Sequence, residues 1–271
     1  MNNFKTIYAI AFLVATTMFL SSCHKDKAQP DLGSGPVTLH FDSQAGSGEF
    51  AFGTNYVTAN GDTVNFSKFN FFVSNVVFVK TDGSTYTPPK DSTYRLVVES
   101  LEESHDLTIN NVPSGDYTGV KFVIGVDSLK SVSDISQRTG DLDPAGAASD
   151  MYWTWNSGYI FYKVEGTSPQ APYDPMMMGK MFFYHIGGFG GYTTADVNNL
   201  RNVSLTYAGE AAHAGKGKAP EIHIYADALQ LWKSPTVFSI VAHPGIMVDP
   251  FSSTVADNYK GMFTIGHIHN D

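Results

Sequence analysis

Cysteine is almost missing from this chain: Cys23 is the single thiol among 271 residues. An internal disulfide is therefore impossible, and sites that need several thiolates, such as zinc knuckles and iron–sulfur clusters, are excluded. Charged residues are also scarce, at 16% of the chain, and 26 acidic residues outnumber 17 basic ones. Nucleic-acid binding depends on neutralising phosphates. A chain with a net charge of −9 and no basic cluster is not expected to bind nucleic acid.

Common enzyme signatures are missing as well. The chain has no Gly-x-Ser-x-Gly elbow, no phosphate-binding P-loop and no His-Glu-x-x-His helix. Acidic side chains do occur in residues 128–150, a long segment with few large apolar groups, and an enzyme that uses this loop is one hypothesis. The sequence does not place these acids across a substrate, so we predict that the protein is not an enzyme.

The N-terminus has the layout of an exported protein. Lys5 precedes a short apolar run that ends in small residues, which is typical of a secretory signal and shorter than the ~20 residues of a membrane span. The end of the run, Leu20-Ser21-Ser22-Cys23, resembles the bacterial lipobox, whose cysteine becomes the lipidated first residue. We predict a signal peptide over 1–22, and a lipidated Cys23 and flexible tether over 23–36.

The polar residues after Cys23 also indicate a location. Lys25 and Asp26 stand where an aspartate retains lipoproteins in the inner membrane of other bacteria. We therefore expect a lipid-anchored protein of the outer membrane, on its periplasmic or its surface side.

Residues 37–271 have the pattern of a single all-β domain. Val37–Phe41 alternates apolar and polar residues as a half-buried strand does, and Asn60-Gly61 is a strong hairpin turn signal. Residues 121–127 are nearly continuous apolar sequence, which indicates a central strand. No segment predicts a helix longer than about three turns. We predict an antiparallel β-sandwich with long loops.

Aromatic residues are densest in residues 151–166. Met151, Trp153 and Trp155 would share one face of a strand. Such a row forms either a wall of the core or the border of a site in which a tryptophan joins a ligand set.

Histidines are the second candidate group, and imidazole is the usual ligand for copper, zinc or nickel. The candidates are His185, His213, His223, His243, His267 and His269. His267 and His269 have the spacing that places both rings on one strand face. A single strand histidine is commonly just hydrogen-bonded, and the methionine run at 176–178 is interpreted as a flexible loop although thioethers suit Cu(I).

Several motifs, taken together, resemble the copper-binding MbnP-like family across roughly residues 37–207. They are Phe71–Val76 (FFVSNV) with Asp82-Gly83, Val112–Tyr117 (VPSGDY), Phe122–Ser128 (FVIGVDS), Gly140–Pro144 (GDLDP), Met151–Gly166 and Tyr184–Gly188 (YHIGG). The tail, with Asn258-Tyr259 and Met262-Phe263, looks like a bacteroidete-type lipoprotein version of the family.

The resemblance implies a β-sandwich without hydrolytic activity that binds copper through histidines, with a tryptophan oxidised to kynurenine taking part. It assigns His185, Trp153 and Trp155 to the metal site, and it suggests a di-haem peroxidase-type partner. The chain departs from the pattern at Tyr152, where copper-binding members more often have histidine. His267 or His269 could replace that imidazole if the C-terminal strand runs beside Trp153.

The sequence therefore favours an exported, lipid-anchored protein that binds metal, with copper as the first candidate. The alternative is a cell-surface module without metal that binds a glycan or a protein through exposed aromatic side chains, since these stack on sugar rings and are enriched in interfaces.

Overall fold

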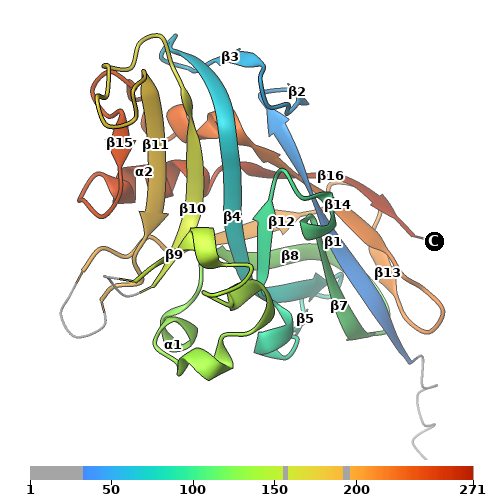
Figure 1. Ribbon diagram of the computed structural model, residues 1–271. Helices are drawn as coiled ribbons and strands as arrows, with labels where there is room; N and C mark the ends of the chain where they lie inside the picture. The colour runs from blue at the N-terminus through green and yellow to red at the C-terminus, as the bar shows by residue number, and fades with distance from the viewer. Residues whose placement is uncertain (1–32, 155–157, 192–195, 271) are drawn as a thin grey trace, which may run out of the picture. The chain divides into compact units, whose positions relative to one another are not determined.

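The strands of this protein pair into two sheets (Figure 1). The computed structural model describes residues 33–154, 158–191 and 196–270, so the predicted signal peptide, Cys23 and Trp155 lie outside the described residues. The two curled sheets form a β-sandwich-like fold, which confirms the all-β prediction. None of the helices in the described ranges has the length and apolarity needed to cross a membrane.

The first sheet, called sheet A here, has the strand order β16-β14-β1-β7, and β2 pairs with the end of β1. Its strands are β1 (Ser34–Ala45), β2 (Gly48–Glu49), β7 (Asp106–Pro113), β14 (Glu221–Asp227) and β16 (Phe263–His269). The sequence predicted an antiparallel sandwich, but the β1–β14 pair is parallel, so sheet A is mixed. β1 begins at Ser34, inside the segment interpreted from the sequence as tether.

The second sheet, sheet B, has the order β12-β8-β4-β10-β11-β15. These strands are β12 (Arg201–Thr206), β8 (Gly115–Ile124), β4 (Thr63–Lys80), β10 (Gly158–Thr167), β11 (Met181–Gly187) and β15 (Gly245–Ile246). Five short strands pair with them: β3 (Asn55–Val57), β5 (Thr85–Tyr86), β6 (Arg95–Val98), β9 (Tyr152–Trp153) and β13 (Ala212–Ala214). The β3–β4 hairpin turns at Gly61, which adopts φ 86°, as the Asn-Gly signal predicts.

Helical structure is limited to short pieces. The α-helices are α1 (Ser128–Ser131) and α2 (Ser252–Tyr259). The 3₁₀ turns are η1 (Lys90–Ser92), η2 (Glu102–Ser104), η3 (Ile135–Gln137), η4 (Gly140–Leu142), η5 (Ser149–Met151) and η6 (Ala228–Trp232). Residues 128–150 form the long connection expected from the sequence, and it contains several short helical pieces.

Alternation along β1 determines which side chains reach the core. Val37, Leu39 and Phe41 point inwards and are at most 1% exposed. The Phe41 ring meets Phe71 of sheet B edge-on, with ring centroids 5.9 Å apart. Such contacts hold the inner faces of the two sheets together, because each buried phenylalanine removes a large apolar surface from water. Residues between these inward positions must therefore point outwards.

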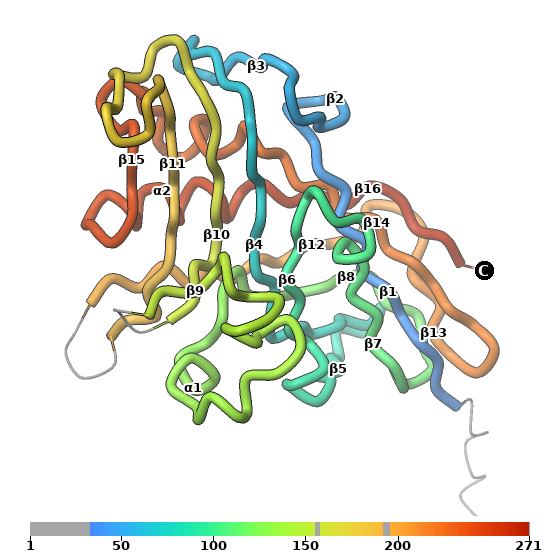
Figure 2. Tube along the Cα trace, viewed as in Figure 1, coloured from blue at the N-terminus to red at the C-terminus, as the bar shows by residue number. Residues whose placement is uncertain are grey.

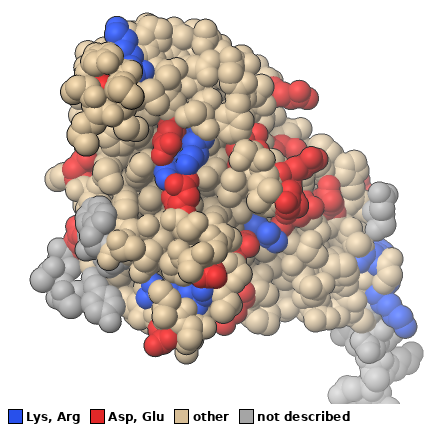
Figure 3. Space-filling view, viewed as in Figure 1, with Lys and Arg blue, Asp and Glu red and all other residues tan. Residues whose placement is uncertain are grey.

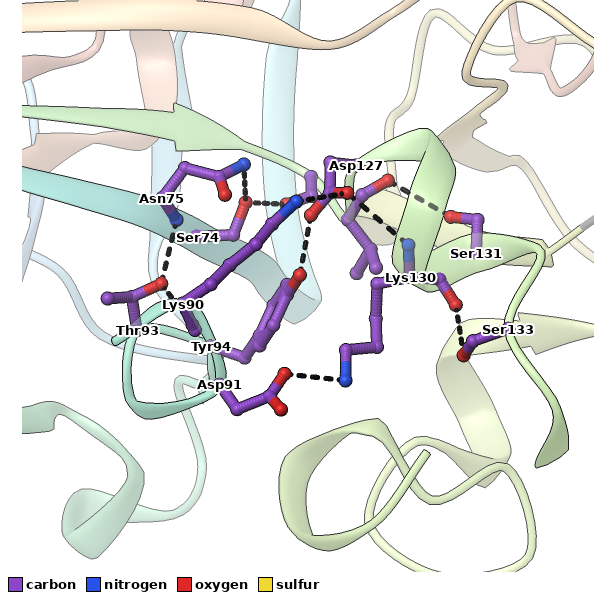
Figure 4. A network of polar contacts seen from close by, with 12 residues as sticks. Ser74, Asn75, Lys90, Asp91, Thr93, Tyr94, Asp127, Lys130, Ser131 and Ser133 are labelled. Carbon is purple, nitrogen blue, oxygen red and sulfur yellow. Dashed lines mark hydrogen bonds and ion pairs between the residues drawn. The ribbon is translucent and has the colours of Figure 1, made fainter. Parts of the chain in front are cut away.

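The loop at 128–151 is attached to the rest of the domain through Asp127 (Figure 4). Its carboxylate accepts hydrogen bonds from Lys90 Nζ at 2.7 Å and Tyr94 Oη at 2.5 Å, and it also caps α1 through the Lys130 N–H. Burial alone would raise the pKa of Asp127, but the hydrogen bonds from Lys90 and Tyr94 outweigh it and hold this pKa below its usual range. The charged Asp127 therefore stabilises the start of the loop.

Candidate metal site

A row of polar side chains crosses the outer face of sheet A. In the strand register, His40 of β1 lies opposite Asp106 of β7 on one side and His223 of β14 on the other. The side chains that gather there form what we call the histidine face: His40, Asp42, Asp106, Glu221, His223, His267 and His269. Figures 1 and 2 show the strands that carry them, β7, β1, β14 and β16. Segments far apart in the chain therefore supply one surface.

An irregularity in β16 turns His267 to this surface. Ile222 pairs with Ile268 but Ile224 pairs with Ile265, so β16 has one extra residue at this point. A β-bulge of this kind re-aims the side chains that follow it. Gly266 lies at the bulge, and a Cβ there would come within 2.7 Å of the Tyr225 ring. The close approach therefore favours glycine at the position before His267.

Three imidazoles converge at the β14–β16 edge of the face. One ring nitrogen from each of His223, His267 and His269 lies within 4.8 Å of the others. The Nε2 atoms of His267 and His269 are 3.1 Å apart, and the His223 ring stacks on His267 at 4.0 Å. Two nitrogens bound to one ion at ~2.0 Å would be 3.1 Å apart at a bond angle of about 100°. His267 and His269 already have this spacing, and the His223 ring, which is stacked on His267, must turn to join them.

The surroundings of His267, at the exposed edge of the three-histidine group, favour its neutral form. Desolvation and the neighbouring His223 and His269 rings lower the pKa of His267 below its ordinary value. Metal ions bind neutral imidazole through its lone pair. A lowered pKa therefore reduces the competition from protons.

Carboxylates hold the inner histidines of the face in place. Asp42 Oδ2 accepts a hydrogen bond from His223 Nδ1 at 2.7 Å, and Asp42 Oδ1 lies 3.2 Å from His40 Nε2. His40 Nδ1 donates to Asp106 Oδ1 at 2.6 Å. Burial lowers the pKa of His40, but the hydrogen bond to Asp106 and the charge of Asp42 outweigh this and raise it overall. The face alternates imidazole and carboxylate from β7 to β14.

His185 lies elsewhere. It is on β11 of sheet B, and its Nε2 is 2.8 Å from Glu165 Oε1. Glu165 in turn lies 3.5 Å from Lys163 Nζ, and the hydrogen bond from His185 lowers its pKa. The C-terminal strand pairs with β14 and does not run beside β9, where Trp153 lies. The condition for His267 or His269 to replace the missing imidazole beside Trp153 is therefore not met, because β16 belongs to the other sheet.

Trp153 is a core residue that lies near the strand of His185. It is 9% exposed and packs in a second apolar cluster with Phe72 and Tyr159. Its ring covers Gly187 of β11, where a Cβ would come within 2.6 Å of the indole. Gly187 is two residues from His185 on the same strand face, so Trp153 borders the outer face of sheet B. The candidate residues are thus divided between two surfaces.

Four members of the histidine face were missed as site residues from the sequence: His40, Asp42, Asp106 and Glu221. His40 was recognised only as part of a strand, and Asp42 was not singled out. The available signal was the spacing of two in three strand segments: His40 with Asp42, Glu221 with His223, and His267 with His269. Such pairs are ordinary on half-exposed strands, and only the strand pairing shows that they meet.

Charge elsewhere on the visible surface is sparse. Figure 3 shows small clusters of acidic and basic groups separated by wide areas without charge. This agrees with the low content of charged residues.

Comparisons with known proteins identify the family of this chain. A search of curated proteins finds no match. Among solved structures, MbnP from Methylosinus trichosporium is similar, with a TM-score of 0.52 and 15% sequence identity over 88% of this chain and 99% of that one. At this identity the likeness shows the fold alone. The family model for MbnP matches residues 34–248, a span that includes sheet B and all of sheet A except β16. By that match the chain belongs to the MbnP family.

Proposed function

We propose that this protein binds a transition-metal ion, with copper as the first candidate, through His223, His267 and His269. The observation that carries the proposal is the convergence of three imidazole nitrogens within 4.8 Å on an exposed strand edge. The family is associated with copper-related function, which makes copper the first metal to test. Imidazole ligands suit copper, zinc and nickel alike, so the donor set alone does not select among them.

Three imidazoles from a rigid sheet would leave at least one coordination position open. Water or a donor molecule could occupy that position. A groove of about 660 Å³, lined by residues 204–210 and 263–268, includes His267 in its wall. An ion or its carrier could therefore reach the triad from this groove.

The wider role that we propose is binding and not catalysis. Lipidation at Cys23 would attach the protein to the outer membrane, and an exported location would place the site outside the cytoplasm. A di-haem peroxidase-type partner is the one that the family resemblance suggests. Mass spectrometry of the protein from its native host would test the lipid on Cys23 directly.

The alternative function, a glycan- or protein-binding module, gains little from the described residues. Trp153 is 9% exposed and Trp232 is fully buried, so neither described tryptophan offers a free face for stacking on a sugar. Met176–Met178 form an exposed apolar loop, and the exposed aromatic rings Tyr173 (63%) and Phe52 (39%) lie in separate parts of the chain. The metal hypothesis is supported better.

Titration with Cu(II), and with Cu(I) under reducing conditions, tests the proposal. The sample is the full chain in detergent without a histidine tag. We expect tight binding that His267→Ala and His269→Ala each weaken strongly, because each removes a ligand. His213→Ala is the matched control, since this partly exposed histidine pairs with Asp116 and lies outside the triad.

The outcome of the same titration with His185→Ala separates the two surfaces. Tight binding that is lost in His185→Ala but kept in His267→Ala and His269→Ala would place the metal on sheet B and overturn the proposal. Loss in the two β16 variants, with binding kept in His185→Ala and His213→Ala, would support it.

A further inference from the structure

We propose that the histidine face holds a second metal ion, bound by His40, Asp42 and His223, and that the His223 ring bridges the two ions. The inference rests on the proposed function for the first ion, at His223, His267 and His269. Both sets are groups of potential ligand atoms that lie within 4.8 Å of one another, and His223 belongs to both.

The potential ligand atoms of the second set lie close together between β1 and β14. Asp42 offers its two carboxylate oxygens to two rings: Oδ2 lies 2.7 Å from His223 Nδ1 and Oδ1 lies 3.2 Å from His40 Nε2. The two rings are 4.8 Å apart between centroids. Two imidazole nitrogens and a carboxylate are a common ligand set for divalent transition metals.

Asp106 prepares His40 for this role. It accepts a hydrogen bond from His40 Nδ1 at 2.6 Å, so the ring presents Nε2 towards Asp42. Metal-binding histidines typically donate their other ring N–H to a carboxylate in this way, which orients the ring and strengthens it as a ligand. Asp106 therefore acts as a positioning residue and touches no metal itself.

His223 has the arrangement needed for a bridge. Its Nδ1 faces Asp42, which leaves Nε2, the ring's other nitrogen, for the group with His267 and His269. Nε2 is buried and has no well-directed hydrogen bond, although Glu221 Oε1 lies 2.8 Å away. When both ions are bound, the proton on Nδ1 leaves for solvent, and the resulting imidazolate gives one lone pair to each ion.

The charges of the face suit two cations. Asp42, Asp106 and Glu221 supply three carboxylates around His40 and His223. Opposite charge at such distances offsets the repulsion between two dications, and the bridging imidazolate adds a further negative charge. The ion pairs of this group among the described residues join only histidines and carboxylates.

The test is the copper stoichiometry of the full chain, solubilised in detergent without a histidine tag. We expect two Cu(II) ions per chain after removal of free metal, and one in His40→Ala, with the affinity of the first equivalent unchanged. His213→Ala should still bind two. Electron paramagnetic resonance gives a second readout: the signal per copper should fall when the second equivalent binds, because an imidazolate bridge couples the two spins.

Asp42→Asn guards against a folding defect in His40→Ala. Asparagine keeps the shape and one oxygen acceptor for His223, but it removes the carboxylate ligand, so this variant should also bind one ion. A wild-type stoichiometry of one that is lost in His267→Ala and unchanged in His40→Ala would overturn the second position and leave the proposed function intact. A stoichiometry of two that persists in His40→Ala and Asp42→Asn, or a second ion without spin coupling, would also overturn it. Failure of the wild type to bind any copper or zinc would overturn both.

Discussion

The substitution Asp42→Asn tests how the carboxylate behind His223 contributes to metal binding at the triad. Asp42 Oδ2 accepts the His223 Nδ1 hydrogen at 2.7 Å, which directs Nε2 away from β1 and increases the electron density on the ring. Asparagine is close in volume and can still accept this hydrogen bond through its oxygen. The substitution therefore removes the negative charge while it preserves the packing.

The expected magnitude follows from the role of such outer carboxylates. Their removal typically weakens metal binding by about 10- to 100-fold, which corresponds to ~1.4–2.7 kcal/mol. The larger value is expected if the ion remains partly dehydrated beside His223, whose side chain is 15% exposed. The smaller value is expected if water screens the lost charge.

The assay is competition for the first equivalent of Cu(II) against a chelator of known affinity. Asp116→Asn is the matched control, because Asp116 accepts a hydrogen bond from His213 Nδ1 at the same distance of 2.7 Å, outside the histidine face. Wild-type affinity in Asp42→Asn, or an equal loss in both variants, would refute the role assigned to Asp42. Equal circular dichroism spectra of the three proteins exclude a change of fold.

Two further predictions concern stability. Asp127→Asn should lower the free energy of unfolding at pH 7 by ~1–3 kcal/mol, because it weakens the hydrogen bonds that the charged carboxylate accepts from Lys90 and Tyr94. Asp91→Asn should change it little, since that carboxylate is 79% exposed. The folded-state pKa of Asp127 is lowered; its contribution is therefore present above the unfolded-chain pKa of about 3.9 and is lost as pH falls through the folded value. Urea denaturation at pH 7 and at acidic pH measures how much Asp127→Asn lowers the free energy of unfolding. An equal loss at the two pH values would contradict the reasoning. Gly187→Ala should lower the free energy of unfolding by ~1–3 kcal/mol through overpacking, because its Cβ would lie 2.5 Å from the Tyr159 carbonyl oxygen and 2.6 Å from the Trp153 ring. Gly209→Ala should leave the free energy of unfolding unchanged, because no atom lies within 4 Å of the added Cβ. A shift of tryptophan fluorescence in Gly187→Ala alone would place the strain beside Trp153.

Much of the fold could be predicted because local patterns match the structure. The alternation in Val37–Phe41 correctly divides β1 into inward apolar and outward polar residues. The Asn-Gly turn at Gly61 and the long connection at 128–150 were also predictable from local chemistry. These features depend on neighbours in sequence, which is why a single chain reveals them.

The site could be predicted only in part, because it depends on how distant strands pair. His267 and His269 share a face as their spacing indicates, and their Nε2 atoms are 3.1 Å apart. Only the pairing of β14 with β16, and the bulge in that pair, shows that His223 lies next to them. The parallel pairing of β1 with β14 then brings in His40. Neither pairing leaves a local pattern in the chain.

The family resemblance located the fold but not the histidine face. It directed attention to His185, which pairs with Glu165 on sheet B. The family model ends at residue 248, so His267 and His269 lie beyond the matched span. Features outside a shared family pattern must be found from contacts in the structure.

The most direct test of the metal site is anomalous diffraction at the copper absorption edge from crystals of the copper-loaded protein. We predict a peak among the Nε2 atoms of His223, His267 and His269. A peak beside His185, or density at neither place in fully loaded crystals, would contradict the account.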